Sequence, residues 1–174
     1  MQALKQFSLP IKGLKIGFHN YSYNLDSLFF AEFDQSPINS SNLNVKLEVE
    51  KKSDHLALVL EFSGTVSTEC NRCTDDIDYP LAFTTDILVK YDVNEREEEE
   101  IIYIHPDAPE FNCAKFIYDM VILAIPMTTT CDDVPHKDCN PEIIARLYQG
   151  NDQEDLDQEI KNPLSEALKN LKLN

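Results

Sequence analysis

The sequence predicts an α+β protein: a mostly antiparallel β-sheet with one face covered by a central helix, followed by short C-terminal helices. Three long runs between residues 45 and 93 alternate apolar and polar side chains with a period of two, which is typical of strands with one buried face. A later segment repeats its apolar residues at helical spacing and ends at Pro126. With 174 residues, the chain is long enough for one ordinary domain and short for two.

The N-terminal part is expected to contribute short elements. Alternating tyrosines and a leucine over residues 21–25 predict a half-exposed strand. Asp26 or Ser27 is placed to cap a brief helical turn over residues 28–33. Residues 34–44 are rich in Ser, Asn and Pro, so we expect a loop before the main sheet.

The main sheet is predicted from residues 45–50, 56–66 and 79–93, each of which places its apolar side chains on one face. Residues 51–54 form a polar break suited to a hairpin turn between the first two runs. Gly64 stands inside the second run, where we expect a β-bulge.

The segment after the sheet is expected to hold a loop, an edge strand and the covering helix. Residues 94–100 form an acidic block whose like charges should repel one another and keep the segment a mobile loop. Residues 101–104 predict a short edge strand. Asp107 and Glu110 have the spacing of a capping box, so the helix is expected to begin there and to end at Pro126.

The predicted domain organisation is a single α+β domain over residues 1–149, an acidic linker over 150–161 and an amphipathic helix over 162–174. Asn140-Pro141 supplies a cap and a first-turn residue for a short helix at the end of the domain.

The net charge of −16 constrains the partner. Residues 1–90 carry a net of −4 and residues 91–174 a net of −12, so the field is strongest in the C-terminal half. Such a chain is repelled by phosphate backbones, which disfavours tight non-specific nucleic-acid binding. Lys5, Lys12 and Lys15 precede the first acidic residue and mark the end where RNA contact is most plausible; the alternative is three solvated lysines at a terminus.

No segment has the pattern of a signal peptide or a membrane-spanning helix, so we expect a cytoplasmic protein with no membrane partner. Cysteines are kept reduced in that compartment. Together with the odd count of five, this favours a metal site or free thiols over disulfides.

Four of the cysteines predict a structural zinc site. Cys70 and Cys73 form a Cys-x-x-Cys pair at the expected turn between two strands, which supplies half of a tetrahedral site. Cys131 and Cys139 lie farther along the chain and are candidates for the second half, with His136 as an alternative ligand at closer spacing to Cys139. The competing interpretation is four reduced thiols without a metal.

Enzymatic readings of the cysteines are disfavoured. A thioredoxin-like couple needs its first cysteine at a helix N-terminus, whereas this pair follows a strand, and Glu69, Asp75 and Asp76 are expected to oppose thiolate formation. Cys113 lies on the apolar stripe of the covering helix and is expected to be a core thiol. The four glycines form no phosphate-binding loop, and there is no nucleophile-elbow pattern. We therefore expect no catalytic residues.

Four segments, in order, resemble the bacterial DUF177 or YceD family, described as large ribosomal RNA subunit accumulation proteins. They are Leu9-Pro10-Ile11-Lys12-Gly13, Cys70-Asn71-Arg72-Cys73, Leu123-Ala124-Ile125-Pro126-Met127 and the stretch from Asn162 to Leu171. The presence of Cys131 and Cys139 resembles the Bacteroidetes branch. Two departures are visible: Thr74 stands where the family usually has Leu, and Asn162-Pro163-Leu164 where it usually has Asp-Pro-Arg.

The resemblance implies a non-enzymatic role in accumulation of large-subunit ribosomal RNA, with no catalytic residues to carry over. Family members are often encoded beside a small zinc-ribbon ribosomal protein. Combined with the negative charge, this favours a basic ribosomal protein or a pre-ribosomal particle as partner, with only weak rRNA contact. Arg72 is the candidate contact residue; the alternative is pairing with Asp75 or Asp76. A zinc-stabilised interaction module unrelated to ribosomes, and more weakly a thiol redox protein, are the competing functions.

Overall fold

The computed structural model describes residues 3–34, 36–38, 40–98 and 101–149. The chain divides into two units, residues 1–139 and 140–174. In the second unit the described element is α3 (Pro141–Gln149), where the Asn140 side chain accepts a hydrogen bond from the Glu142 backbone, as the sequence predicted. The predicted linker over 150–161 and the predicted helix over 162–174 lie outside the described residues, and the single domain over 1–149 stays a prediction. Within the described part of the chain, no helix is long and apolar enough to cross a bilayer.

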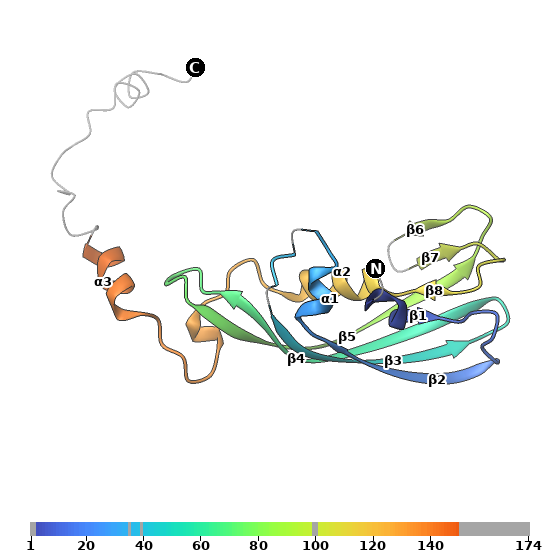
Figure 1. Ribbon diagram of the computed structural model, residues 1–174, viewed down its shortest axis with the longest axis horizontal. Coiled ribbons are helices and arrows are strands. Elements are labelled where there is room, and N and C mark those ends of the chain that lie inside the picture. The colour runs from blue at the N-terminus through green and yellow to red at the C-terminus, as the bar shows by residue number, and fades with distance from the viewer. Residues whose placement is uncertain (1–2, 35, 39, 99–100, 150–174) are drawn as a thin grey trace, which may run out of the picture. The chain divides into compact units, whose positions relative to one another are not determined.

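A six-stranded, mostly antiparallel sheet forms the body of the first unit, which confirms the α+β class (Figure 1). Its order is β2-β3-β4-β5-β7-β6, and only β5 and β7 pair in parallel. A second, two-stranded sheet joins β1 to β8. The strands are β1 (Ser8–Leu9), β2 (Gly17–Leu25), β3 (Ser41–Lys51), β4 (His55–Glu69), β5 (Asp76–Tyr91), β6 (Arg96–Glu98), β7 (Ile101–Ile104) and β8 (Phe111–Asn112).

The edge beyond β5 differs from its prediction in two ways. Residues 101–104 were expected at the edge, but β7 lies between β5 and β6. Residues 94–100 were expected as a mobile loop, but Arg96–Glu98 form strand β6. The reason is Arg96, which lies 2.7 Å from Asp92 and 2.6 Å from Glu98 and stacks 3.8 Å from the centre of the Tyr103 ring. These contacts offset the repulsion expected of the acidic block.

The expected bulge at Gly64 is absent from β4, because the register runs unbroken through Leu43, Gly64 and Leu81. The glycine is required for another reason. Its φ is +146°, and a Cβ at this position would lie 2.1 Å from the Asn42 carbonyl oxygen. Close approach of β3 to β4 therefore selects glycine here.

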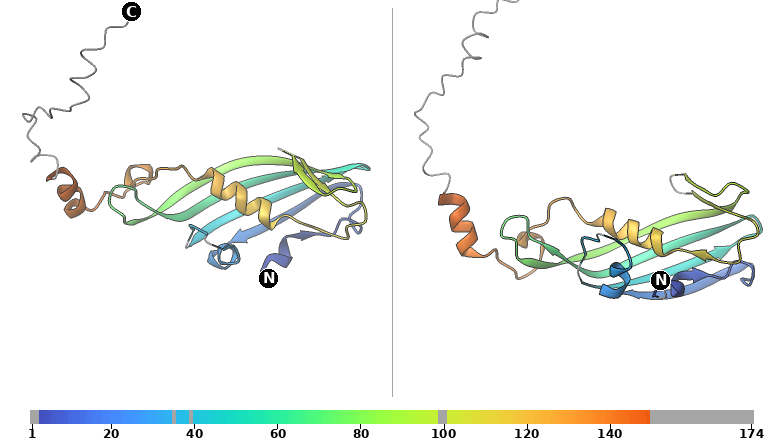
Figure 2. Two further views of the ribbon diagram at one scale, coloured as in Figure 1. Left: turned by 90° about the horizontal axis from the view of Figure 1, so that it is seen from above. Right: turned by 45° about the horizontal axis from the view of Figure 1, so that its top comes forward.

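Helix α2 (Ala114–Ala124) covers the inner face of the sheet, as predicted (Figure 2). Its buried residues Ala114, Ile117 and Val121 belong to the same core as the inward side chains of β2 to β5. The predicted start at Asp107 is wrong, because residues 111–112 pair with β1 as strand β8. The helix begins at Ala114 instead, where the Asn112 side chain accepts a hydrogen bond from the Ala114 backbone. Its end before Pro126 is confirmed.

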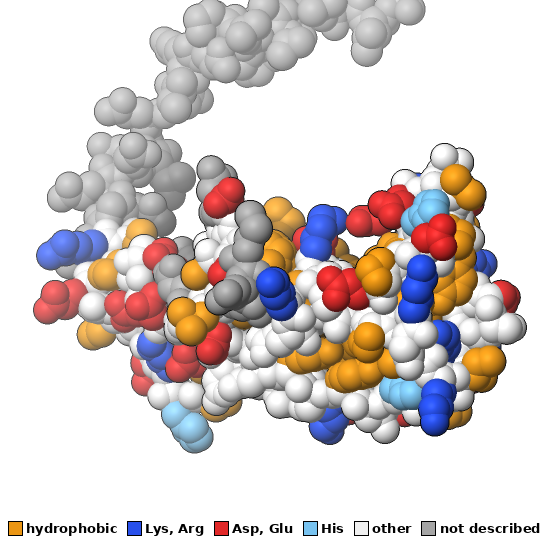
Figure 3. Space-filling view, turned by 45° about the vertical axis from the view of Figure 1, so that its right-hand side comes forward, with side chains coloured by type: hydrophobic (Ala, Val, Ile, Leu, Met, Phe, Trp, Pro, Cys, Tyr) orange, Lys and Arg blue, Asp and Glu red, His pale blue; other side chains and the backbone are white. Residues whose placement is uncertain are grey.

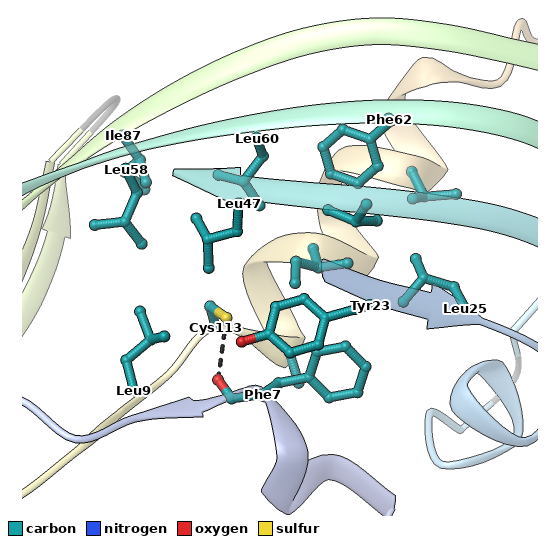
Figure 4. Close-up of a cluster of buried hydrophobic side chains, with 14 of the residues drawn as sticks. Phe7, Leu9, Tyr23, Leu25, Leu47, Leu58, Leu60, Phe62, Ile87 and Cys113 are labelled. Atoms are coloured by element: carbon teal, nitrogen blue, oxygen red, sulfur yellow. Dashed lines mark hydrogen bonds between the residues drawn. The ribbon is translucent and has the colours of Figure 1, made fainter. Parts of the chain in front are cut away.

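The N-terminal elements pack beside α2 on the same face of the sheet. They are the 3-10 turn η1 (Ala3–Phe7) and α1 (Ser27–Ala31), the latter capped by Asp26 as predicted. The ring centre of Phe7 lies 4.7 Å from that of Tyr23 and 4.9 Å from that of Phe29. Cys113 is fully buried here, and its thiol donates a hydrogen bond to the Phe7 carbonyl at 3.0 Å (Figure 4). Its predicted place as a core thiol is confirmed.

Candidate metal centre

The first half of the centre is the turn that joins β4 to β5. The Cys70 backbone N–H donates to the Asp75 carbonyl at 2.9 Å, and the Thr74 N–H donates to the Cys70 carbonyl at 2.8 Å. These bonds curl the chain so that Cys70 and Cys73 are both buried at the tip of the hairpin. Thr74 has a positive φ of 61°, a strained conformation for a β-branched residue. The turn is therefore held in a defined shape by its surroundings.

The second half follows α2 and is fixed to the hairpin by Asn71 and Thr129. The Asn71 N–H donates to the Thr129 carbonyl at 2.8 Å, and the Thr129 N–H donates to the Asn71 side-chain oxygen at 2.7 Å. The buried Thr129 hydroxyl also donates to the Glu69 carbonyl at 3.0 Å. The next turn, η2 (Cys131–Asp133), is thereby placed against the hairpin tip.

Four cysteines from the two halves converge in space. The Sγ atoms of Cys70, Cys73, Cys131 and Cys139 all lie within 4.8 Å of one another. The Sγ–Sγ distance is 3.8 Å between Cys70 and Cys139 and 3.6 Å between Cys73 and Cys131. A tetrahedral zinc site with Zn–S bonds of about 2.3 Å has sulfur atoms roughly 3.8 Å apart. All four cysteines are free thiols, so the spacing fits a four-sulfur site for a soft metal ion.

Three thiols of the cluster, those of Cys70, Cys131 and Cys139, have pKa values shifted in different directions. Burial opposes ionisation of Cys70, but backbone N–H groups of Cys73, Arg72 and Cys131 outweigh it and lower the pKa of the Cys70 thiol to about 6. Burial raises the pKa of Cys131 and of Cys139. The pKa of Cys70 is therefore low despite the acidic neighbours that were expected to oppose a thiolate, because donated hydrogen bonds stabilise its charge. A metal ion would displace the protons of the other thiols on binding.

The structure chooses between the alternatives left open for the second half. Cys131 is fully buried within the cluster. His136 is exposed, has a positive φ of 61°, and is not a member of the group that the described residues bring together. The sulfur set is thus Cys70, Cys73, Cys131 and Cys139. That this set holds a metal stays a prediction.

Arg72 crosses the centre instead of pairing within its own hairpin. Its guanidinium Nη2 lies 2.6 Å from the Asp132 carboxylate on the turn after Cys131. The expected pairing with Asp75 or Asp76 is therefore replaced by an ion pair that joins the two halves. Asn71, Thr129 and Asp132 were missed by sequence reasoning, because each pairs with a residue about 60 positions away and no spacing rule connects them.

Comparison with known proteins decides the family. The chain matches the family described as large ribosomal RNA subunit accumulation protein YceD over residues 58–172. It belongs to the YceD family. The matched range begins in β4 and includes all four clustered cysteines, and the resemblance inferred from the sequence is confirmed. No curated protein and no solved structure matches the chain.

The YceD name associates the chain with accumulation of large-subunit ribosomal RNA and denotes no class of enzyme. The geometry around the cysteines agrees with a non-catalytic centre. Cys70 follows a strand and opens a turn, so it lacks the helix N-terminus of a thioredoxin-like couple. Four protein sulfurs would also complete a tetrahedral site and leave no open position for a substrate.

Two of the predicted contact residues, Lys12 and Lys15, lie far from the cysteines. Lys12 and Lys15 lie in the segment before β2, at the end of the sheet where β4 begins, whereas Cys70 follows the end of β4. β4 has 15 residues, so about 45 Å separates its two ends. Lys12 lies 3.7 Å from Asp107, and Lys5 is exposed in η1. A role in binding for these lysines and for Arg72 stays a prediction.

Proposed function

We propose that the protein is a non-enzymatic factor in large-subunit ribosomal RNA accumulation that acts in the cytoplasm by holding a basic ribosomal protein or a pre-ribosomal particle. The observation that carries the proposal is the family match over residues 58–172. The partner class follows from charge, because a chain with a net charge of −16 attracts a basic protein and is repelled by bare RNA.

The cysteine cluster is proposed as a structural zinc site that supports this role. Cys70 and Cys73 come from the β4–β5 hairpin, and Cys131 and Cys139 from the segment after α2. A metal ion shared by all four sulfurs would lock these two segments together, since its binding energy stabilises only the folded arrangement. Zinc suits four thiolates and this compact spacing. Arg72 at the same corner is the side chain we propose as a partner contact.

Depletion of the protein in its host tests the proposed function. We expect the amount of mature large-subunit rRNA to fall relative to small-subunit rRNA, and a plasmid copy of the wild-type gene to restore the ratio. Quantitative analysis of total RNA measures both. An unchanged ratio after complete depletion contradicts the ribosomal function. If the protein still carries a metal ion in that case, an interaction module unrelated to ribosomes becomes the better account.

A further inference from the structure

Helix α2 has two apolar faces, and only one of them is fully buried against the sheet. Phe116, Met120 and Leu123 follow one another at helical spacing, away from the buried face, and Leu123 is 76% exposed. Figure 2 shows why the two flanks of the helix differ: α1 and the N-terminal segment lie on one side, whereas β5 and the β6–β7 pair lie on the other. The second apolar face therefore lies on the flank of α2 toward β6 and β7, which none of the described helices covers.

A groove of about 380 Å³ occupies this position. Its lining includes Ile87 and Ile102 from the sheet and Phe116, Met120 and Leu123 from the helix, with Glu97 on β6 opposite the helix. We call it the α2–β6 groove. Flexible methionine and aromatic side chains are characteristic of surfaces that adapt to a protein partner.

The rim of the α2–β6 groove is acidic. Lys115 lies 3.3 Å from both Glu97 and Asp119, and these carboxylate side chains are 65% and 43% exposed. Arg96 and Glu98 flank Glu97 on β6, so their side chains point to the other face of the strand, where Arg96 contacts Asp92 and Glu98. Figure 3 shows acidic side chains gathered beside hydrophobic ones on the face that carries this part of the molecule.

At the rim of the groove, two carboxylates, Glu97 and Asp119, share one cation, Lys115, which leaves a net of one negative charge. An exposed ion pair such as Lys115–Glu97 is weak, so a partner's cation can replace Lys115 beside Glu97. The groove thus combines an apolar floor with a rim that carries net negative charge.

We propose that the α2–β6 groove binds an amphipathic segment of a basic protein, with apolar side chains against Phe116, Met120 and Leu123 and Lys or Arg side chains at the acidic rim. This inference rests on the proposed function and assigns its partner a place on the molecule. RNA is disfavoured as occupant because the rim repels phosphates. A second copy of this chain is disfavoured because both partners would bring net negative charge.

The test is a binding titration of the full-length protein against individually purified large-subunit ribosomal proteins. Leu123→Ser removes the most exposed apolar side chain of the groove, and we expect about tenfold weaker binding of the partner protein. Val59→Ser is the matched control, because Val59 is an exposed apolar residue on the face of β4 that points away from α2. It should leave the affinity unchanged. Raising the salt concentration should weaken wild-type binding.

Three outcomes overturn the groove assignment. Equal binding by Leu123→Ser and wild type places the partner elsewhere and leaves the proposed function intact. Binding of the wild type to rRNA fragments through Leu123, with no protein bound, shows that the occupant is RNA. Absence of binding to every ribosomal protein removes the groove's partner, and the rRNA ratio after depletion then decides separately whether the proposed function stands. Thermal unfolding of both variants verifies that they are folded.

Discussion

Cys70 of the cluster and Cys113 of the core differ in chemistry although both are buried. Cys73, Cys131 and Cys113 are each fully buried. The Cys113 thiol donates its hydrogen bond to the Phe7 carbonyl, and burial raises its pKa to about 12, so it stays neutral. Cys70 instead accepts a hydrogen bond from the Arg72 backbone, and its pKa is about 6 despite burial. Burial alone therefore does not set the charge of a thiol, because the hydrogen bonds that Cys70 accepts lower its pKa.

The two regions also use different means to hold distant segments together. Around Cys113, η1, β2 and α2 are joined by apolar packing and aromatic contacts. Cys70, Cys73 and Cys131 are not part of the main hydrophobic cluster, and polar pairs such as Asn71–Thr129 and Arg72–Asp132 connect the two halves of the centre. A metal ion would supply at this corner the cohesion that the hydrophobic core supplies elsewhere.

Loss of one cluster sulfur should have the largest effect. We expect Cys73→Ser to abolish metal binding and to lower the free energy of unfolding by about 4 kcal/mol, the scale of losses that remove a metal. Denaturant unfolding with and without a chelator measures this, and the chelator should leave the variant unchanged while destabilising the wild type. A wild type indifferent to the chelator would show that the four thiols are merely packed together.

Removal of the core thiol should cost less and leave the metal in place. Cys113→Ala removes the thiol's hydrogen bond to the Phe7 carbonyl, which keeps the Cys113 backbone N–H as a donor at 3.1 Å, and it creates a small cavity, so we expect a loss of about 1 kcal/mol. The metal content should equal that of the wild type. A fall in metal content would mean that the core around Cys113 and the cysteine cluster are coupled, which would contradict their separation into two regions.

The smallest expected effect is a difference in reaction rate between the thiols of Cys70 and Cys113. In metal-free protein at pH 7, Cys70 is largely ionised because its pKa is about 6, so it should be alkylated faster than the equally buried Cys113. Its rate should fall as the pH is lowered through 6, since the thiolate is the reactive form. Cys113 should react last, only when the protein unfolds. Mass spectrometry of the labelled peptides gives the order, and early labelling of Cys113 would contradict its assignment to the core.

Sequence reasoning succeeded where the signal is local. In each of β3, β4 and β5, the alternation of apolar and polar residues identifies the buried face. The cysteines are recognisable as candidate ligands by residue type alone. It failed where pairing joins distant segments. β8 exists because residues 111–112 meet β1, which displaces the predicted start of α2. Likewise, the sequence leaves Cys131 and His136 open as ligands, and only the folded position of the segment after α2 shows that Cys131 joins the cluster.

The central claim is that the four sulfurs hold one metal ion, and its most direct test is the metal content of protein purified without added metal or chelator. Elemental analysis should find about one zinc ion per chain, retained through gel filtration, in both the wild type and Cys113→Ala. Cys73→Ser should carry none. Wild-type protein that is folded, fully reduced and free of metal would contradict the account.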